Sequence, residues 1–309
     1  MSHRASKLIV LIFSAFTLNF SHAAPPSRSS LEELVETSGL NADLKEIEQS
    51  LVKGAVEEAA KKNPQDETTK RLIDILLADN LRESFQYSLL MDEVTYFLKK
   101  QVSEEDVQMA LTWYQSDLGQ RIVQAEAKAS TATAEIQSGR EELLKQQDLV
   151  AMASEVDQAI GLTDAMVELQ INTQKAMILA GLAVVAPGKD MSDLEHANWS
   201  DIKASDRDAL RKPIEQHIQT TFIYTMKDFS IEEREKYREF LLKPGSIKLN
   251  NAVITGISKA VEIGAHNFMT ELANDIENPS PELDQLIKQQ TSNANASATE
   301  TTPDSSSDW

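Results

Sequence analysis

Residues 97–119 read FLKKQVSEEDVQMALTWYQSDLG, and residues 224–245 read YTMKDFSIEEREKYREFLLKPG. Each of these two passages holds a serine with an acidic residue three positions later: Ser103 with Asp106, and Ser230 with Glu233. In this pattern the serine oxygen accepts a hydrogen bond from the backbone at a helix start, and the acid reaches back to the serine N–H. We therefore predict a short capped helix in each passage, ended by the glycine at its close.

The similarity of the two passages predicts a tandem duplication of a helical unit. A long second arm is expected after each passage, over about 120–137 and 246–276. A repeat reports how a fold is assembled rather than what it does. We expect two similar helical-hairpin lobes, residues 31–139 and 140–277, with a groove between them.

Hydrophobic periodicity along the rest of the chain predicts an all-α fold. Apolar residues recur at spacings of three and four, as in Leu72, Ile75 and Leu76, and this pattern predicts one long helix over about 67–101. We find no convincing stretch of alternating apolar and polar residues, which a half-buried strand requires.

The first residues of the chain have the features of a secretory signal peptide, predicted over residues 1–23. Arg4 and Lys7 precede an apolar stretch, residues 8–20, and small residues precede the expected cleavage after Ala23. A membrane anchor is the alternative, but the stretch is shorter than the roughly 20 residues that a membrane span needs. The chain has no cysteine, so it has no site for lipid attachment. We expect a soluble protein that is periplasmic or secreted.

The C-terminal part, residues 278–309, is expected to hold a short helix followed by a disordered tail. The helix is predicted over 282–290. From residue 291 onward the composition is almost entirely small and polar, which does not supply enough apolar surface to order a chain.

The net charge of −19 argues against several classes of partner. Removal of Arg4 and Lys7 with the signal peptide takes it to −21. Nucleic acids and acidic lipid headgroups both require a positive surface, and no cluster of Lys and Arg supplies one. We therefore predict no nucleic-acid binding. No membrane span is predicted after cleavage either, because the apolar run at 176–186 has only 11 residues.

The end of the first passage resembles a bacterial family called domain of unknown function 2059. The resemblance rests on the capped helix followed by Trp113-Tyr114-Gln115-Ser116-Asp117-Leu118-Gly119. The second passage resembles the same motif with one residue deleted, and it has Lys243 in place of the serine. Two tandem copies of the family motif are therefore expected. The resemblance implies an exported helical protein of the cell envelope and implies no activity.

The sequence offers few candidates for catalysis or metal binding. Without cysteine there is no thiol nucleophile, and there is no Gly-x-Ser-x-Gly motif for a serine nucleophile. Three histidines follow residue 23, without the spacing of a metal site. Adjacent acids recur, and Glu104 and Glu232 are the candidates if the chain is a glycosidase or another carboxylate-dependent hydrolase. No metal, cofactor or catalytic residue is predicted.

Surface recognition remains as the expected function. Trp199 is the aromatic residue expected on a loop, where binding residues concentrate, and we expect it, with Glu104 and Glu232, to take part in interactions. The predicted function is a non-catalytic binding module for an unidentified envelope protein or component. The alternatives are a cell-wall hydrolase and a carrier of apolar molecules, the latter suggested by the apolar run 177–186.

Overall fold

The computed structural model describes residues 24–62, 67–171 and 204–299, and these residues form helices and connecting turns without a strand. The predicted all-α class is confirmed. The predicted signal peptide, the apolar run 177–186 and Trp199 lie outside the described residues. The helices are α1 (Arg28–Thr37), α2 (Leu40–Lys62), α3 (Glu67–Ile73), the π-helix η1 (Asp74–Asp79), α4 (Asn80–Ser84), α5 (Tyr87–Gln101), α6 (Glu104–Tyr114), α7 (Asp117–Thr131), α8 (Thr133–Ser138), α9 (Arg140–Leu143), α10 (Gln147–Ile160), a helical segment at 162–171, α13 (Ala204–Met226), α14 (Ile231–Leu241), α15 (Pro244–Glu277) and α16 (Pro281–Thr299).

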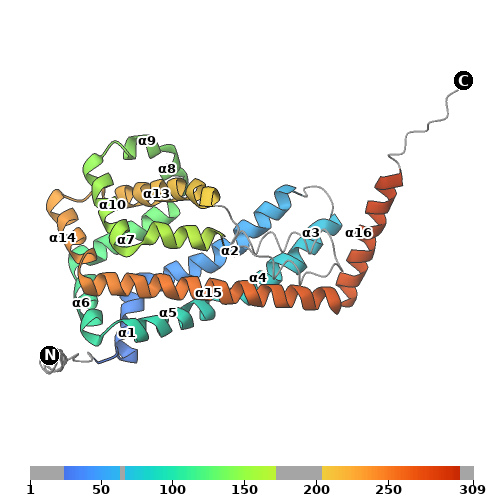
Figure 1. Ribbon diagram of the computed structural model, residues 1–309, viewed down its shortest axis with the longest axis horizontal. Helices are drawn as coiled ribbons and strands as arrows, with labels where there is room; N and C mark the ends of the chain where they lie inside the picture. Colours follow the sequence, from blue (N-terminus) through green and yellow to red (C-terminus); the bar gives the residue numbers. More distant parts are fainter. Residues whose placement is uncertain (1–23, 63–66, 172–203, 300–309) are drawn as a thin grey trace, which may run out of the picture.

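Helix α15 is the axis of the molecule. It has 34 residues and is therefore about 50 Å long at 1.5 Å per residue. Figure 1 shows it running from a body formed by α6 to α10, α13 and α14 to a second end formed by α3, α4 and α16. The arm predicted over 246–276 is this helix.

Two hydrophobic clusters lie along α15, one at each end. The larger cluster includes Leu34 and Val107 from the first half of the chain and Ile223 and Phe240 from the second. The smaller cluster likewise joins residues of α3 and α4 to Phe268 of α15. Because both halves contribute to both clusters, the predicted division into lobes at 31–139 and 140–277 is not confirmed.

Both predicted capping boxes are present. The Ser103 hydroxyl accepts a hydrogen bond from the Asp106 N–H at 3.2 Å, and Ser230 does the same for Glu233 at 3.3 Å. Each acid in turn accepts from the backbone N–H of its serine. The helices that follow, α6 and α14, both have 11 residues.

Helices α5 and α15 approach each other closely, and glycine makes this possible. A Cβ atom added to Gly256 of α15 would lie 2.5 Å from the Cα and 2.8 Å from the N of Val94 in α5. Neither backbone atom moves independently of its helix, so a larger residue would force the helices apart.

The prediction of one long helix over 67–101 is wrong, because this stretch forms four elements, α3, η1, α4 and α5. After α3 the helix changes to the wider π-helical form in η1. Helical geometry then ends at Phe85, where φ is −114° and ψ is 39°. Gln86 is extended and α5 starts after it. The Phe85 ring is buried in the smaller cluster, and its burial at a bend is a tertiary effect that helical periodicity does not contain.

The C-terminal helix is longer than predicted. It starts at Pro281 and continues to Thr299, nine residues into the predicted disordered tail. Its start is held in the core, where Leu283 is 1% exposed. A helix anchored at one end adds further residues at low cost, since elongation is easier than nucleation.

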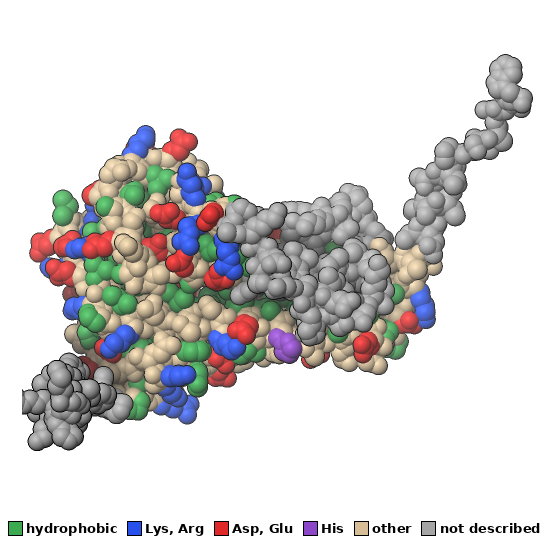
Figure 2. All heavy atoms as spheres, in the orientation of Figure 1, with side chains coloured by type: hydrophobic (Ala, Val, Ile, Leu, Met, Phe, Trp, Pro, Cys, Tyr) green, Lys and Arg blue, Asp and Glu red, His purple; other side chains and the backbone are tan. Residues whose placement is uncertain are grey.

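The surface of the body is mixed in charge. Figure 2 shows acidic and basic side chains interspersed over the face in view. Within residues 24–62, 67–171 and 204–299, no helix combines the length and apolar character that a membrane span requires.

Candidate binding cavity

A row of stacked aromatic rings joins the two passages. Trp113 of α6 stacks on Phe240 of α14 with ring centroids 4.6 Å apart and planes 8° from parallel. Trp113 also stacks on Tyr237 at 6.0 Å, and Tyr237 in turn on Phe222 of α13 at 6.2 Å. Such pairs add to the burial of the rings. Packed aromatic side chains thus join the two passages.

The two passages also exchange partners. The helix that precedes the first cap, α5, packs on α15 from the second passage, whereas α13 packs on α7 from the first. Two ion pairs repeat this exchange: Arg121 of α7 with Glu233 of the second cap at 2.6 Å, and Lys248 of α15 with Asp106 of the first cap at 3.2 Å. The passages therefore interlock rather than forming separate hairpins.

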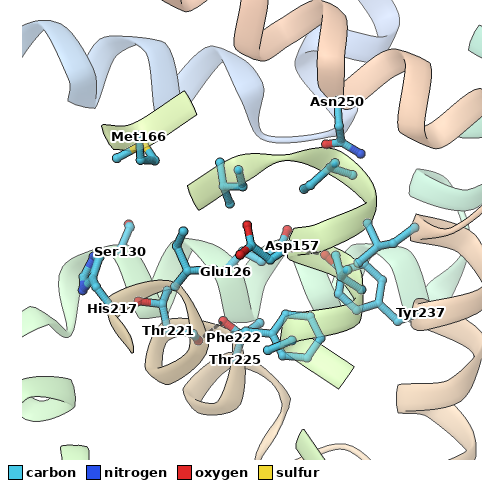
Figure 3. Close-up of a pocket in the computed structure, with 16 residues that line it drawn as sticks. Glu126, Ser130, Asp157, Met166, His217, Thr221, Phe222, Thr225, Tyr237 and Asn250 are labelled. Carbon is cyan, nitrogen blue, oxygen red and sulfur yellow. Dashed lines mark hydrogen bonds between the residues drawn. The ribbon is translucent and has the colours of Figure 1, made fainter. Parts of the chain in front are cut away.

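A cavity of about 380 Å³ lies among α7, α10, α13 and α14, beside the aromatic row. Half of its 16 lining residues have apolar side chains and half have polar ones, which Figure 3 labels. This volume is typical of a small-molecule site. The polar members are Glu126, Ser130, Asp157, His217, Thr221, Thr225, Tyr237 and Asn250.

Glu126 of α7 is the most perturbed acid in the lining. The Tyr237 hydroxyl donates to its Oε1 at 2.5 Å, a contact drawn dashed in Figure 3. Burial raises the pKa of Glu126 to about 7, and the charge of Asp43 adds to the rise while the Tyr237 hydrogen bond opposes it. Burial also raises the pKa of Tyr237 well above its ordinary value. At neutral pH the cavity therefore contains a carboxyl group that is partly protonated.

Two further polar groups in the lining differ in how they are satisfied. Asp157 of α10 accepts two hydrogen bonds from Thr163, from its N–H at 2.7 Å and from its hydroxyl at 2.6 Å. The hydroxyl oxygen of Thr221 on α13 is buried and has no hydrogen-bond partner. A buried hydroxyl without a partner costs free energy.

Counting back from the two capping serines reveals how the cavity arises. On α5 the positions 5, 9 and 13 residues before Ser103 are Leu98, Val94 and Leu90, each at most 1% exposed. The same positions before Ser230 on α13 are polar and line the cavity: Thr225, Thr221 and His217. A stripe that is closely packed on one helix is thus polar and faces a cavity on the other.

Glu104 and Glu232, the two residues proposed from sequence that the structure describes, lie elsewhere and are not brought together. Glu104 of α6 accepts hydrogen bonds from the Ser30 hydroxyl and the Ser27 N–H, both at 2.6 Å, so it holds the start of α1. These hydrogen bonds, with one from Gln108, lower the pKa of Glu104. Glu232 is exposed on α14 and pairs with Lys236 at 3.1 Å. Neither residue lines the cavity.

The serine and glycine of the first motif serve the fold. Ser116 caps α7, accepting from the Gly119 N–H at 3.0 Å and donating to the Trp113 carbonyl at 2.6 Å. A Cβ at Gly119 would overlap that carbonyl, so glycine is needed there. In the second passage Lys243 makes no such cap, and Pro244 at the first helical position starts α15 instead.

Metal ligation has no support in the described parts of the chain. No three His, Asp or Glu side chains there are grouped closely enough to hold a metal ion. The cavity offers hydrogen-bonding groups and apolar contact to a ligand.

One comparison with known proteins gives a match. The model of a family described as "Uncharacterized protein conserved in bacteria (DUF2059)" matches residues 89–144, so this stretch is similar to that family. It runs from α5 past α9 and contains the first passage, whereas the second passage lies outside it. No curated protein and no solved structure matches the chain.

Sequence reasoning did not find the cavity residues. Glu126 did carry an indication, because it lies on the buried stripe of α7, between Ile122 and Ala129. A carboxylate on an apolar face is costly to bury and so marks a special position. The polar stripe of α13 carried a second indication, visible only by comparison with α5.

Proposed function

We propose that the chain is an exported binding protein of the bacterial cell envelope, periplasmic or secreted, and that it carries a small, mainly apolar molecule in the cavity. The observation that carries the proposal is the contrast between the packed stripe of α5 and the polar, cavity-lining stripe of α13. If stability alone determined the residue at position 221, an apolar side chain would be favoured there, since the buried Thr221 hydroxyl has no hydrogen-bond partner. The other two positions of the stripe are less unusual, because the Thr225 hydroxyl donates to the Thr221 carbonyl and His217 is exposed. Export rests on the predicted signal peptide.

A tandem duplication forms part of the proposal. The matching caps, equal lengths of α6 and α14, and reciprocal ion pairs support it. One member of a duplicated pair is then free to retain close packing while the other acquires a ligand site.

The other functions have less support. A hydrolase that uses Glu104 and Glu232 would need both carboxylates at a substrate, but one holds α1 and the other pairs with a surface lysine. Binding of an envelope protein remains compatible with the carrier function, with the partner unidentified.

The test is calorimetric titration of octan-1-ol into the intact chain and two variants. The cavity holds about 12 water-sized volumes, so an eight-carbon alcohol fits. Ser130→Phe places a ring in the cavity, and Thr131→Phe, one residue along α7 and exposed, is the matched control. We expect saturable binding to the unmodified chain and to Thr131→Phe, with at least tenfold weaker binding to Ser130→Phe. Equal binding by both variants, or no binding at all, would refute the proposal.

A further inference from the structure

The charge of the cavity wall limits which small molecules fit it. Its lining contains two carboxyl groups, those of Glu126 and Asp157, and contains no lysine or arginine. A ligand with a carboxylate or phosphate would bring a negative charge toward these groups, and His217 is the one residue of the lining that can carry a positive charge to receive it. Such a charge is costly in a site of low dielectric constant.

Glu126 lines the cavity and has a second carboxyl oxygen that can accept a hydrogen bond. Its Oε1 accepts from Tyr237, and no described side chain or backbone group donates to its Oε2. A carboxylate oxygen is stabilised most by a donor that also carries positive charge.

An aromatic ring in the cavity wall also suits a cation. Phe222 and Tyr237 both line the cavity. Tyr237 is stacked on Trp113 and on Phe222, so the ring face left for a cation is the one that Phe222 turns away from Tyr237. The face of an aromatic ring attracts an ammonium group, more strongly where water is excluded.

A second hollow adjoins the cavity and is also acidic. It has a volume of about 370 Å³ and shares Asp157 with the first. Its lining adds Asp164 and Glu215, with Arg211 as the one basic residue of its lining, and Arg211 pairs with Asp164. The polar end of a ligand that extends past Asp157 would thus meet acidic groups again.

We infer that the ligand is a cationic amphiphile, an apolar chain or ring system that bears an amine, with its ammonium group at Glu126 Oε2 and its apolar part against α10 and α13. The inference rests on the proposed function and specifies its ligand class. Fatty acids and other anionic amphiphiles are excluded by it.

Three eight-carbon probes test the inference on the intact chain: octylamine, octan-1-ol and octanoate, each below its micelle concentration. We expect octylamine to bind at least tenfold more tightly than octanoate, with octan-1-ol between them. Glu126→Gln should weaken octylamine about tenfold and change octan-1-ol less than twofold. The control is Glu232→Gln, which removes a carboxyl group from an exposed position outside the cavity and should leave all three affinities unchanged.

The outcomes separate the two proposals. Octanoate binding as tightly as octylamine in the unmodified chain would overturn the inference, even if Glu126→Gln failed to fold. Equal losses of octylamine affinity in Glu126→Gln and Glu232→Gln would also overturn it, because net charge alone would then explain the preference. In both cases tight binding of octan-1-ol would leave the carrier function standing, whereas absence of binding by all three probes would refute both.

Discussion

The helix pairs α5/α15 and α13/α7 occupy corresponding places in the two passages but differ in packing. In the first pair, Gly256 lets the backbone of α15 lie against Val94. In the second pair, Thr221 corresponds to Val94 by count from the capping serines, and Ser130 corresponds to Gly256 by count from the glycines that end the passages, Gly119 and Gly245. A cavity lies between the helices there. Ala252, fully buried on α15, corresponds likewise to Glu126 on α7. The same helical framework thus supports a packed core at one place and a binding cavity at the other.

The largest effect is expected from the aromatic row that both pairs share. Trp113→Ala removes the ring that stacks on Phe240 and Tyr237, and we expect a loss of about 3 kcal/mol in the free energy of unfolding. Urea denaturation measures this loss. A double-mutant cycle with Phe240→Ala should give a coupling of about 1 kcal/mol, and additive effects would show that the two rings do not act together.

The close-packed pair should be intolerant of added volume. Gly256→Ala introduces a Cβ that meets the Val94 backbone, and we expect a loss of about 2 kcal/mol, as for other overpacked cores. The control is Gly54→Ala on α2, where a Cβ meets nothing within 4 Å. Because alanine favours helix more than glycine does, that variant should gain up to about 1 kcal/mol. Equal gains at both positions would mean that α5 and α15 are not in close contact.

The all-α class, both caps and the long arm over α15 could be predicted from local sequence, because capping and helical periodicity act within a few residues. The exchange of partners could not. Arg121 pairs with Glu233 across 112 residues, and nothing in either neighbourhood specifies this contact. The bend at Phe85 and the cavity beside Glu126 likewise depend on which helices meet. The sequence shows that α13 has polar residues where α5 has apolar ones. That these polar residues line a cavity could be seen only once the helix that packs against α13 was known.

The cavity pair should respond to pH through Glu126. Its pKa is about 7 in the folded chain, against an ordinary value of 4.5, so between these values the native state holds a proton that the unfolded state releases. Stability contributed by this group is therefore lost as pH rises from about 4.5 to 7. A glutamine side chain does not titrate, so the Glu126→Gln variant should be more stable than the unmodified chain by about 1.5 kcal/mol at pH 8 and by little at pH 5. Urea denaturation at both pH values measures the difference, and a pH-independent difference would contradict the assignment.

A swap of near-isosteric residues tests the comparison directly, with the smallest expected effect. Thr221→Val removes the buried hydroxyl that has no partner and should stabilise the chain by about 1 kcal/mol. Val94→Thr places a hydroxyl in the packed pair and should have the opposite sign. Thermal unfolding of the two variants measures both effects. A shift of the unfolding temperature in the same direction in both variants would show that the two stripes are equivalent.

The most direct test of the central claim, that the cavity between α7 and α13 binds a small ligand and its packed counterpart does not, is methyl NMR during titration with octan-1-ol. We predict saturable shifts at the methyl groups of Ile160 and Met166, which line the cavity. Those of Leu90 and Leu98, which are closely packed on α5, should stay in place. Shifts of equal size at both sets, or at neither, would contradict the claim.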